Sequence, residues 1–319
     1  MKNLIFAIII ILSITLTAGC IAEEETAIEA GHIHITRRGD SRAEMLSFIE
    51  EASNNELSVR GSCAGELRTY LELAINRGSI ERGTLFTHGH IDVHRLFEDA
   101  RPFVEALPER YIVREEFSEL ADPTGKLHLV WVDAFVIIYN PEQINRENVP
   151  NTWSYLAEFE QGIALPTKGC IGSWGTIALY YHLGEEKFTT LIDNTQVDSK
   201  IRPTVSAVVN GIVPIGVAHL LDPRVKNGEV GVIWPKDGAI ARPAFMIIPK
   251  NPTEYHLRLA DILMSQDAAK LYANEFNVAS SLPNGPAPDI IIKNDFNFIY
   301  IPSTAIMCDE KNRQVIEIL

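Results

Sequence analysis

Three histidines and an aspartate gather in one short stretch of this chain, and together they could hold a metal ion. The stretch THGHIDVH, at residues 87–94, contains His88, His90, Asp92 and His94. Imidazole nitrogens and carboxylate oxygens are zinc ligands, and a zinc ion with an open position activates water for hydrolysis. Three interpretations stay open: a zinc-dependent hydrolase, a metal site of His88, His90 and His94 without catalysis, or polar residues at a strand-to-helix turn.

The same stretch resembles the metal motif of metallo-β-lactamase-fold hydrolases, with one departure. In those enzymes a histidine directly follows the aspartate, whereas here Val93 takes that place and His94 comes one residue later. The downstream histidines are scattered, and the chain shows no Ser-His-Asp order, phosphate-binding P-loop or dinucleotide fingerprint. The plain turn is therefore the favoured interpretation, and we predict neither a catalytic residue nor a required cofactor.

Two glycine-containing loops precede predicted helices, and each could bind an anion. Their residues are small, aromatic or hydroxyl-bearing: Ser62, Cys63 and Gly65 in the first, and Gly172, Ser173, Trp174, Gly175 and Thr176 in the second. Free backbone N–H groups and the helix dipole attract anions at such positions, although the same residues also serve as ordinary caps. We expect both loops to contact a ligand, with Trp174 either forming an aromatic wall or facing the core.

Arg37 and Arg38 follow the first predicted strand and are further candidates for ligand contact. Their guanidinium groups could bind a carboxylate or a phosphate. The alternative is that they are solvated loop residues.

Alternating strands and helices predict an α/β fold. Residues 32–36 and 57–60 are strand-like, and each is followed by a loop and then by apolar residues at helical spacing. Such alternation implies mostly parallel sheets covered by helices, with ligands at the carboxyl ends of the strands. The β-branched run at residues 127–141 is too long for one strand of one lobe, so we predict a strand that passes from a first lobe into a second.

The rest of the chain continues the pattern. Predicted helices cover residues 153–159, 172–182, 185–192, 203–209, 254–264 and 268–276, and predicted strands cover 162–165, 213–217, 230–234 and 244–248. The last of these strands returns the chain to the first lobe.

The order of these pieces resembles the substrate-binding lipoproteins of ABC importers, in the type II group that includes ferric-iron and polyamine binders. The likeness rests on sequence pieces at residues 139–141, 150–153, 162–165, 172–173, 183–187, 209–211, 235–239 and 260–270. It implies a two-lobed type II periplasmic-binding-protein-like fold in which each lobe is a mostly parallel sheet flanked by helices and hinge strands join the lobes. We expect the first lobe at residues 30–134 and 245–319 and the second at 135–244.

The resemblance also implies a function and a ligand class. Such proteins close over a small molecule or ion and present it to a permease, although the same fold also serves ligand-sensing receptor modules. We expect this chain to be a monomer. Ferric-iron members grip the metal partly through adjacent tyrosines just after a segment that corresponds to residues 210–217. Here that place holds Ala218, His219 and Leu220, so His219 would have to substitute. The cargo stays open between an oxyanion, a metal ion and a metal chelate.

The N-terminus predicts export and a lipid anchor. Lys2 is followed by a 13-residue, mostly apolar run at 4–16 and by small residues before Cys20. The run is too short to span a membrane, which takes roughly 20 apolar residues. It matches a signal peptide at residues 1–19 that is cleaved before a lipidated Cys20, although Thr17 stands where lipoprotein signals usually have leucine. A tether at 20–29 would hold the body at the outer face of the cytoplasmic membrane.

Charge and cysteine content add two limits. The chain has 28 basic and 42 acidic residues, a net charge of −14, and loss of Lys2 with the signal peptide makes it −15. This acidity argues against nucleic acid as a partner. Cys63, Cys170 and Cys308 would remain beside a lipidated Cys20, and either one disulfide or three buried thiols is compatible with the sequence.

Overall fold

The computed structural model describes residues 28–34, 40–61, 64–80, 83–88, 91–107 and 111–300. The predicted signal peptide, the tether with Cys20, and Cys308 lie outside these residues. Among the residues that are described, no helix has the length and apolar character needed to cross a membrane.

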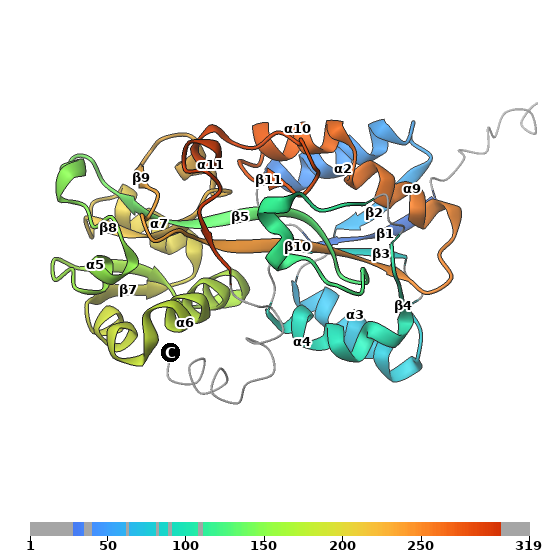
Figure 1. Cartoon of the computed structure of the whole chain (residues 1–319), viewed down its shortest axis with the longest axis horizontal. Helices are drawn as coiled ribbons and strands as arrows, with labels where there is room; N and C mark the ends of the chain where they lie inside the picture. Colours follow the sequence, from blue (N-terminus) through green and yellow to red (C-terminus); the bar gives the residue numbers. More distant parts are fainter. Residues whose placement is uncertain are drawn as a thin grey trace, which may run out of the picture.

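One mixed sheet runs along the length of the molecule (Figure 1). Its strand order is β2-β1-β3-β10-β5-β8-β6-β7. The bounds are β1 (Ile28–His34), β2 (Leu57–Gly61), β3 (Thr84–His88), β5 (His128–Tyr139), β6 (Ile163–Pro166), β7 (Thr195–Ser199), β8 (Ile215–His219) and β10 (Ala239–Pro249). Short strands extend the pairing of β5 and β10: β4 (Val104–Glu105), β9 (Gly231–Ile233), β11 (Ala279–Ser280) and β12 (Phe298–Ile299).

The two ends of this sheet are parallel and its middle is antiparallel. β1 pairs in parallel with β2 and β3, and β6 pairs in parallel with β7 and β8. Between them β5 and β10 run antiparallel to each other, and every residue of both strands is buried. This arrangement confirms the predicted α/β class, with one mixed sheet in which two sets of parallel strands are joined by the crossing strands β5 and β10. The exact residue limits of the two lobes stay a prediction.

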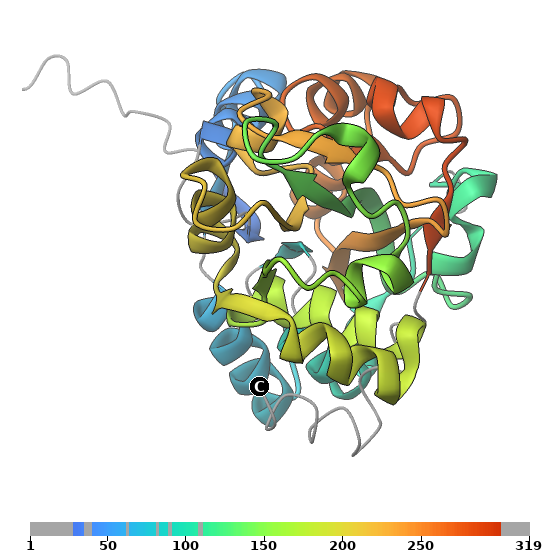
Figure 2. The ribbon, with the colours of Figure 1, turned by 90° about the vertical axis from the view of Figure 1, so that its left-hand side faces the viewer.

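Helices cover both faces of the sheet, with α2, α9 and α10 on one side and α3, α4 and α6 on the other (Figures 1 and 2). The α-helices are α2 (Asp40–Ala52), α3 (Ala64–Arg77), α4 (Ile91–Ala100), α5 (Trp153–Ala157), α6 (Gly169–Asp193), α7 (Ile201–Val209), α8 (Pro223–Lys226), α9 (Glu254–Leu263), α10 (Gln266–Asn274) and α11 (Asp289–Lys293). Three 3-10 helices join them: η1 (Arg101–Phe103), η2 (Glu115–Leu120) and η3 (Arg146–Asn148).

Helix α6 both confirms and corrects the sequence prediction. The expected break after residue 182 is present, because Gly184 has a φ of 75° inside the helix. The expected start at residue 172 is wrong, since the helix begins at Gly169. Residues 172–176 are therefore helical rather than a loop before the helix. Gly65 likewise lies inside α3 rather than in the preceding loop.

A buried tryptophan ties the start of α5 to the start of β10. The Trp153 side chain is fully buried, and its Nε1 donates to the Gly238 carbonyl oxygen at 2.7 Å. Its backbone N–H donates to the Asp237 carboxylate, which also lies 3.2 Å from His182 Nε2. These bonds fix the point where the chain enters β10.

Replacing Trp153 with phenylalanine should lower the free energy of unfolding by about 1–3 kcal/mol, because the buried Gly238 carbonyl loses its donor. Urea denaturation measures the change. Tyr155→Phe on the same helix is the matched control, since this side chain is 61% exposed and should change stability by less than about 0.5 kcal/mol. Equal losses in the two variants would contradict the assigned role of the indole N–H.

Candidate functional site

The two sets of parallel strands point their carboxyl ends at the middle of the crossing strands β5 and β10. On one side β3 ends at His88, which is paired with Ala244 of β10. On the other side β8 ends at His219, which is paired with Phe135 of β5. Ligands of open α/β sheets bind outside the carboxyl ends of strands, where strand order reverses. This middle point is therefore the candidate functional site.

A buried ion cluster of Asp133, Arg242 and His219 lies at that point. Asp133 and Arg242 are direct register partners on the two crossing strands, and both are fully buried. Arg242 Nη2 lies 2.8 Å from Asp133 Oδ2, and His219 Nδ1 lies 3.0 Å from the same oxygen. The remaining carboxylate oxygen of Asp133 accepts a bond from the Ala134 N–H at 2.8 Å. One carboxylate thus joins β5, β8 and β10.

Burial and pairing set the charge states of this cluster. Burial alone would raise the pKa of Asp133, but the Arg242 and His219 side chains and the Ala134 N–H hold that pKa below its usual value. Burial lowers the pKa of the Arg242 guanidinium, and the facing carboxylate opposes this shift. Since arginine stays protonated in proteins, the cluster presents a buried salt bridge at neutral pH.

The first half of α6 is packed directly onto the crossing strands. Trp174 is 1% exposed, and its Nε1 donates to the Ala241 carbonyl oxygen at 3.1 Å. A side-chain carbon at Gly175 would lie 3.0 Å from the Phe135 ring, closer than most such contacts, so glycine eases this close approach. Thr176 is buried, and its hydroxyl bonds to the Pro166 carbonyl oxygen at 3.1 Å. Trp174 is therefore a core residue rather than an open wall, and these three residues position α6.

Thr167 is a buried polar residue that the sequence analysis did not single out. It follows the last residue of β6, lies just before α6, and is 5% exposed. Its hydroxyl has no hydrogen-bond partner among the described residues. Buried hydroxyl groups without a partner are rare and call for a ligand or a water. In the sequence, the position of Thr167 between an apolar strand and the start of a helix could have indicated it.

The structure places the predicted ligand residues in different parts of the molecule, and some lie outside the residues that it describes. Arg37, Arg38, Ser62, Cys63 and His90 lie outside the described residues. Gly172 and Ser173 form part of the first turns of α6, so contact with a ligand stays a prediction for them. His219 is buried in the ion cluster and is already held by Asp133, so its contact with a ligand stays a prediction.

The predicted metal stretch lies where a strand meets a helix. His88 is the last residue of β3, and His94 belongs to α4, which begins at Ile91. This confirms the expected strand-to-helix turn, whereas a metal site there stays a prediction. In the part of the chain that the structure describes, no three histidine, cysteine or acidic side chains gather closely enough to hold a metal ion.

Replacing Asp133 with asparagine should lower the free energy of unfolding by about 3–5 kcal/mol, because the buried guanidinium loses its counter-charge. Because the pKa of Asp133 is lowered in the folded protein, this loss should be complete above about pH 5, and the difference from wild type should shrink as the pH falls below that. Denaturation at pH 7 and pH 3 measures both effects. Asp267→Asn, in an exposed pair with Lys270, should change stability by less than about 1 kcal/mol at either pH.

Solved structures with this fold have little sequence in common with the chain. A ferric ion-binding protein A from Pasteurella haemolytica, solved without its ligand, superposes with a TM-score of 0.70 at 15% identity over 91% of this chain and 96% of that one. A Trichodesmium protein in complex with iron and citrate gives 0.68 at 16% identity over 90% and 97%. The substrate-binding protein of an ABC transporter from Agrobacterium tumefaciens gives 0.71 at 14% identity over 93% and 94%.

These likenesses show the two-lobed fold and no more, because the identities are low. No curated protein matches the chain in sequence. A family profile described as bacterial extracellular solute-binding protein, however, matches residues 94–301, well over half of the 319 residues. The chain belongs to the bacterial extracellular solute-binding protein family.

Proposed function

We propose that this protein is the solute-binding component of an ABC importer and that it captures a small anionic cargo, an oxyanion or a metal chelate, between its two lobes. The observation that carries the proposal is the convergence of both sets of strand ends on the buried Asp133–Arg242 pair. The Agrobacterium protein, which has the same fold, is the binding component of an ABC transporter. The family description, an extracellular solute-binding protein, supports a location outside the cytoplasm and a binding role rather than hydrolysis.

The mechanism follows from the two crossing strands. Because β5 and β10 run through both halves of the sheet, a small change of their backbone angles would move one half relative to the other. A ligand that contacts both halves binds the closed form more tightly and shifts the population toward it by that difference in affinity. The closed form would then be presented to the permease.

The chemistry at the strand ends favours an anionic cargo over a bare metal ion. The first backbone N–H groups of α6 have no partner within the helix, and Thr167 supplies a hydroxyl group just before it. His219 is bonded to Asp133, and Asp222 caps α8 and pairs with Arg224 at 3.1 Å, so both side chains are already engaged. The Trichodesmium relative holds iron together with citrate, an anionic chelator, which supports a chelate as one form of the cargo.

Replacing Thr167 with valine should weaken cargo binding about tenfold, since the shape is kept and one hydrogen bond to the ligand is lost. Isothermal titration of the purified protein with phosphate, sulfate, citrate, ferric citrate and ferric ion measures it. Thr189→Val, in the second half of α6, is the matched control and should bind as wild type, because the Thr189 hydroxyl donates to the Glu185 carbonyl oxygen.

Three results would count against this proposal. Binding of ferric ion alone would reject an anionic cargo, and zinc binding that is lost in His88→Gln would favour the separate metal site. Full affinity in Thr167→Val would remove this residue from the site.

The anchoring part of the proposal rests on the N-terminal sequence. Cleavage before Cys20 and lipidation of its thiol would hold the protein at the outer face of the membrane. Mass spectrometry of the expressed protein should show an N-terminal diacylglyceryl cysteine, and Cys20→Ser should lack this modification and leave the membrane fraction. Cys308→Ser should stay in the membrane fraction. An intact residue 1–19 segment on the mature protein would refute the anchor.

A further inference from the structure

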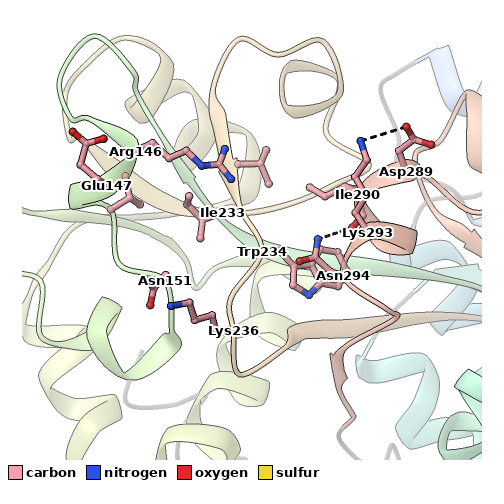
Figure 3. A pocket seen from close by; sticks show the side chains of 12 residues that line it. Arg146, Glu147, Asn151, Ile233, Trp234, Lys236, Asp289, Ile290, Lys293 and Asn294 are labelled. Carbon is pink, nitrogen blue, oxygen red and sulfur yellow. Dashed lines mark hydrogen bonds and ion pairs between the residues drawn. The ribbon is translucent and has the colours of Figure 1, made fainter.

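A separate hollow lies between the segment around η3, strand β9 and helix α11 (Figure 3). Its volume is about 750 Å³, within the range of small-molecule sites. It is lined by the segment around η3, by β9 and the residues after it, and by α11. None of its lining residues belongs to the buried ion cluster, so it is a different site from the one at the strand ends.

The floor of this hollow is apolar and firmly held. Ile233 and Trp234 are 7% and 9% exposed, and Ile290 faces them from α11 (Figure 3). The Trp234 Nε1 donates to the Asn297 carbonyl oxygen at 3.0 Å, and the indole ring packs edge-on against Phe298 at 5.2 Å. The wall is anchored as well, because Ile291 of α11 is fully buried in the core. The hollow is thus preformed.

Two of the three cationic side chains that line this hollow have no ion-pair partner among the described residues. Among the residues that the structure describes, Arg146 and Lys236 form no ion pair, and both are exposed. Lys293 is paired with Asp289 at 3.6 Å, and the Glu147 side chain points away from Ile233 and Trp234 (Figure 3). The Arg146 side chain extends toward Ile233, and Lys236 lies beside Asn151 (Figure 3).

We propose that this hollow binds a small organic anion with an apolar or aromatic body and a carboxylate or phosphate group. The body would lie on Ile233 and Trp234, and the anionic group would pair with Arg146 and Lys236. Two unpaired cations beside an apolar floor match this class in both charge and hydrophobicity. In a chain with a net charge of −14, such a local excess of positive charge also differs from the surface as a whole.

Phenyl phosphate is the probe, because it joins an aromatic ring to a phosphate. Isothermal titration should show binding to the purified protein, with little heat from inorganic phosphate, which lacks the body, or from benzyl alcohol, which lacks the charge. Arg146→Gln and Lys236→Gln should each weaken binding about tenfold, the effect of losing one charge-assisted hydrogen bond. Lys187→Gln, an exposed lysine on α6, should bind as wild type.

The comparison of variants distinguishes this site from the one at the strand ends. No measurable binding of phenyl phosphate by the wild-type protein would overturn the proposal, and so would equal affinity in Arg146→Gln, Lys236→Gln and Lys187→Gln. Equal binding of inorganic phosphate would show that the apolar floor contributes nothing to affinity, and it would reject the class of ligand proposed. Since Arg146 and Lys236 are surface residues, the variants should keep the thermal unfolding midpoint of the wild type.

Discussion

The buried salt bridge between Asp133 and Arg242 is the constraint on which the arrangement of this protein depends. Either ion alone in the interior would cost several kcal/mol, and the pair offsets that cost only when the geometry is close to ideal. The two residues therefore hold β5 and β10 in register at one point. His219 of β8 contacts the same carboxylate, so side chains from all three central strands meet at Asp133.

The Asp133–Arg242 pair also lies where the two halves of the sheet meet. The strands on either side end at His88 and His219, within two residues of the pair along β10 and β5. The helix α6 reaches the same point because Gly175 lets it approach Phe135. A ligand at the strand ends would thus contact elements of both halves, which is the condition for closure driven by binding.

Local sequence patterns predicted an element correctly where the pattern was strong. The crossing strand was predictable because residues 127–141 are too apolar and too long for a single lobe, and β5 spans His128–Tyr139. The kink at Gly184 was predictable from a glycine between two helical patterns. Strand β7 was missed because its sequence TQVDS is polar and half exposed, and it exists through pairing with β6.

By itself the sequence determined the α/β class, the order of elements and the resemblance to type II binding proteins, because these depend on periodicity and on the succession of strands and helices. Only the tertiary structure decided which polar residues meet. Asp133, His219 and Arg242 are more than 20 residues apart and become neighbours through strand pairing. The start of α6 was decided in the same way, since packing of Trp174 and Gly175 on the crossing strands stabilises a helix where glycine and serine alone indicate a loop.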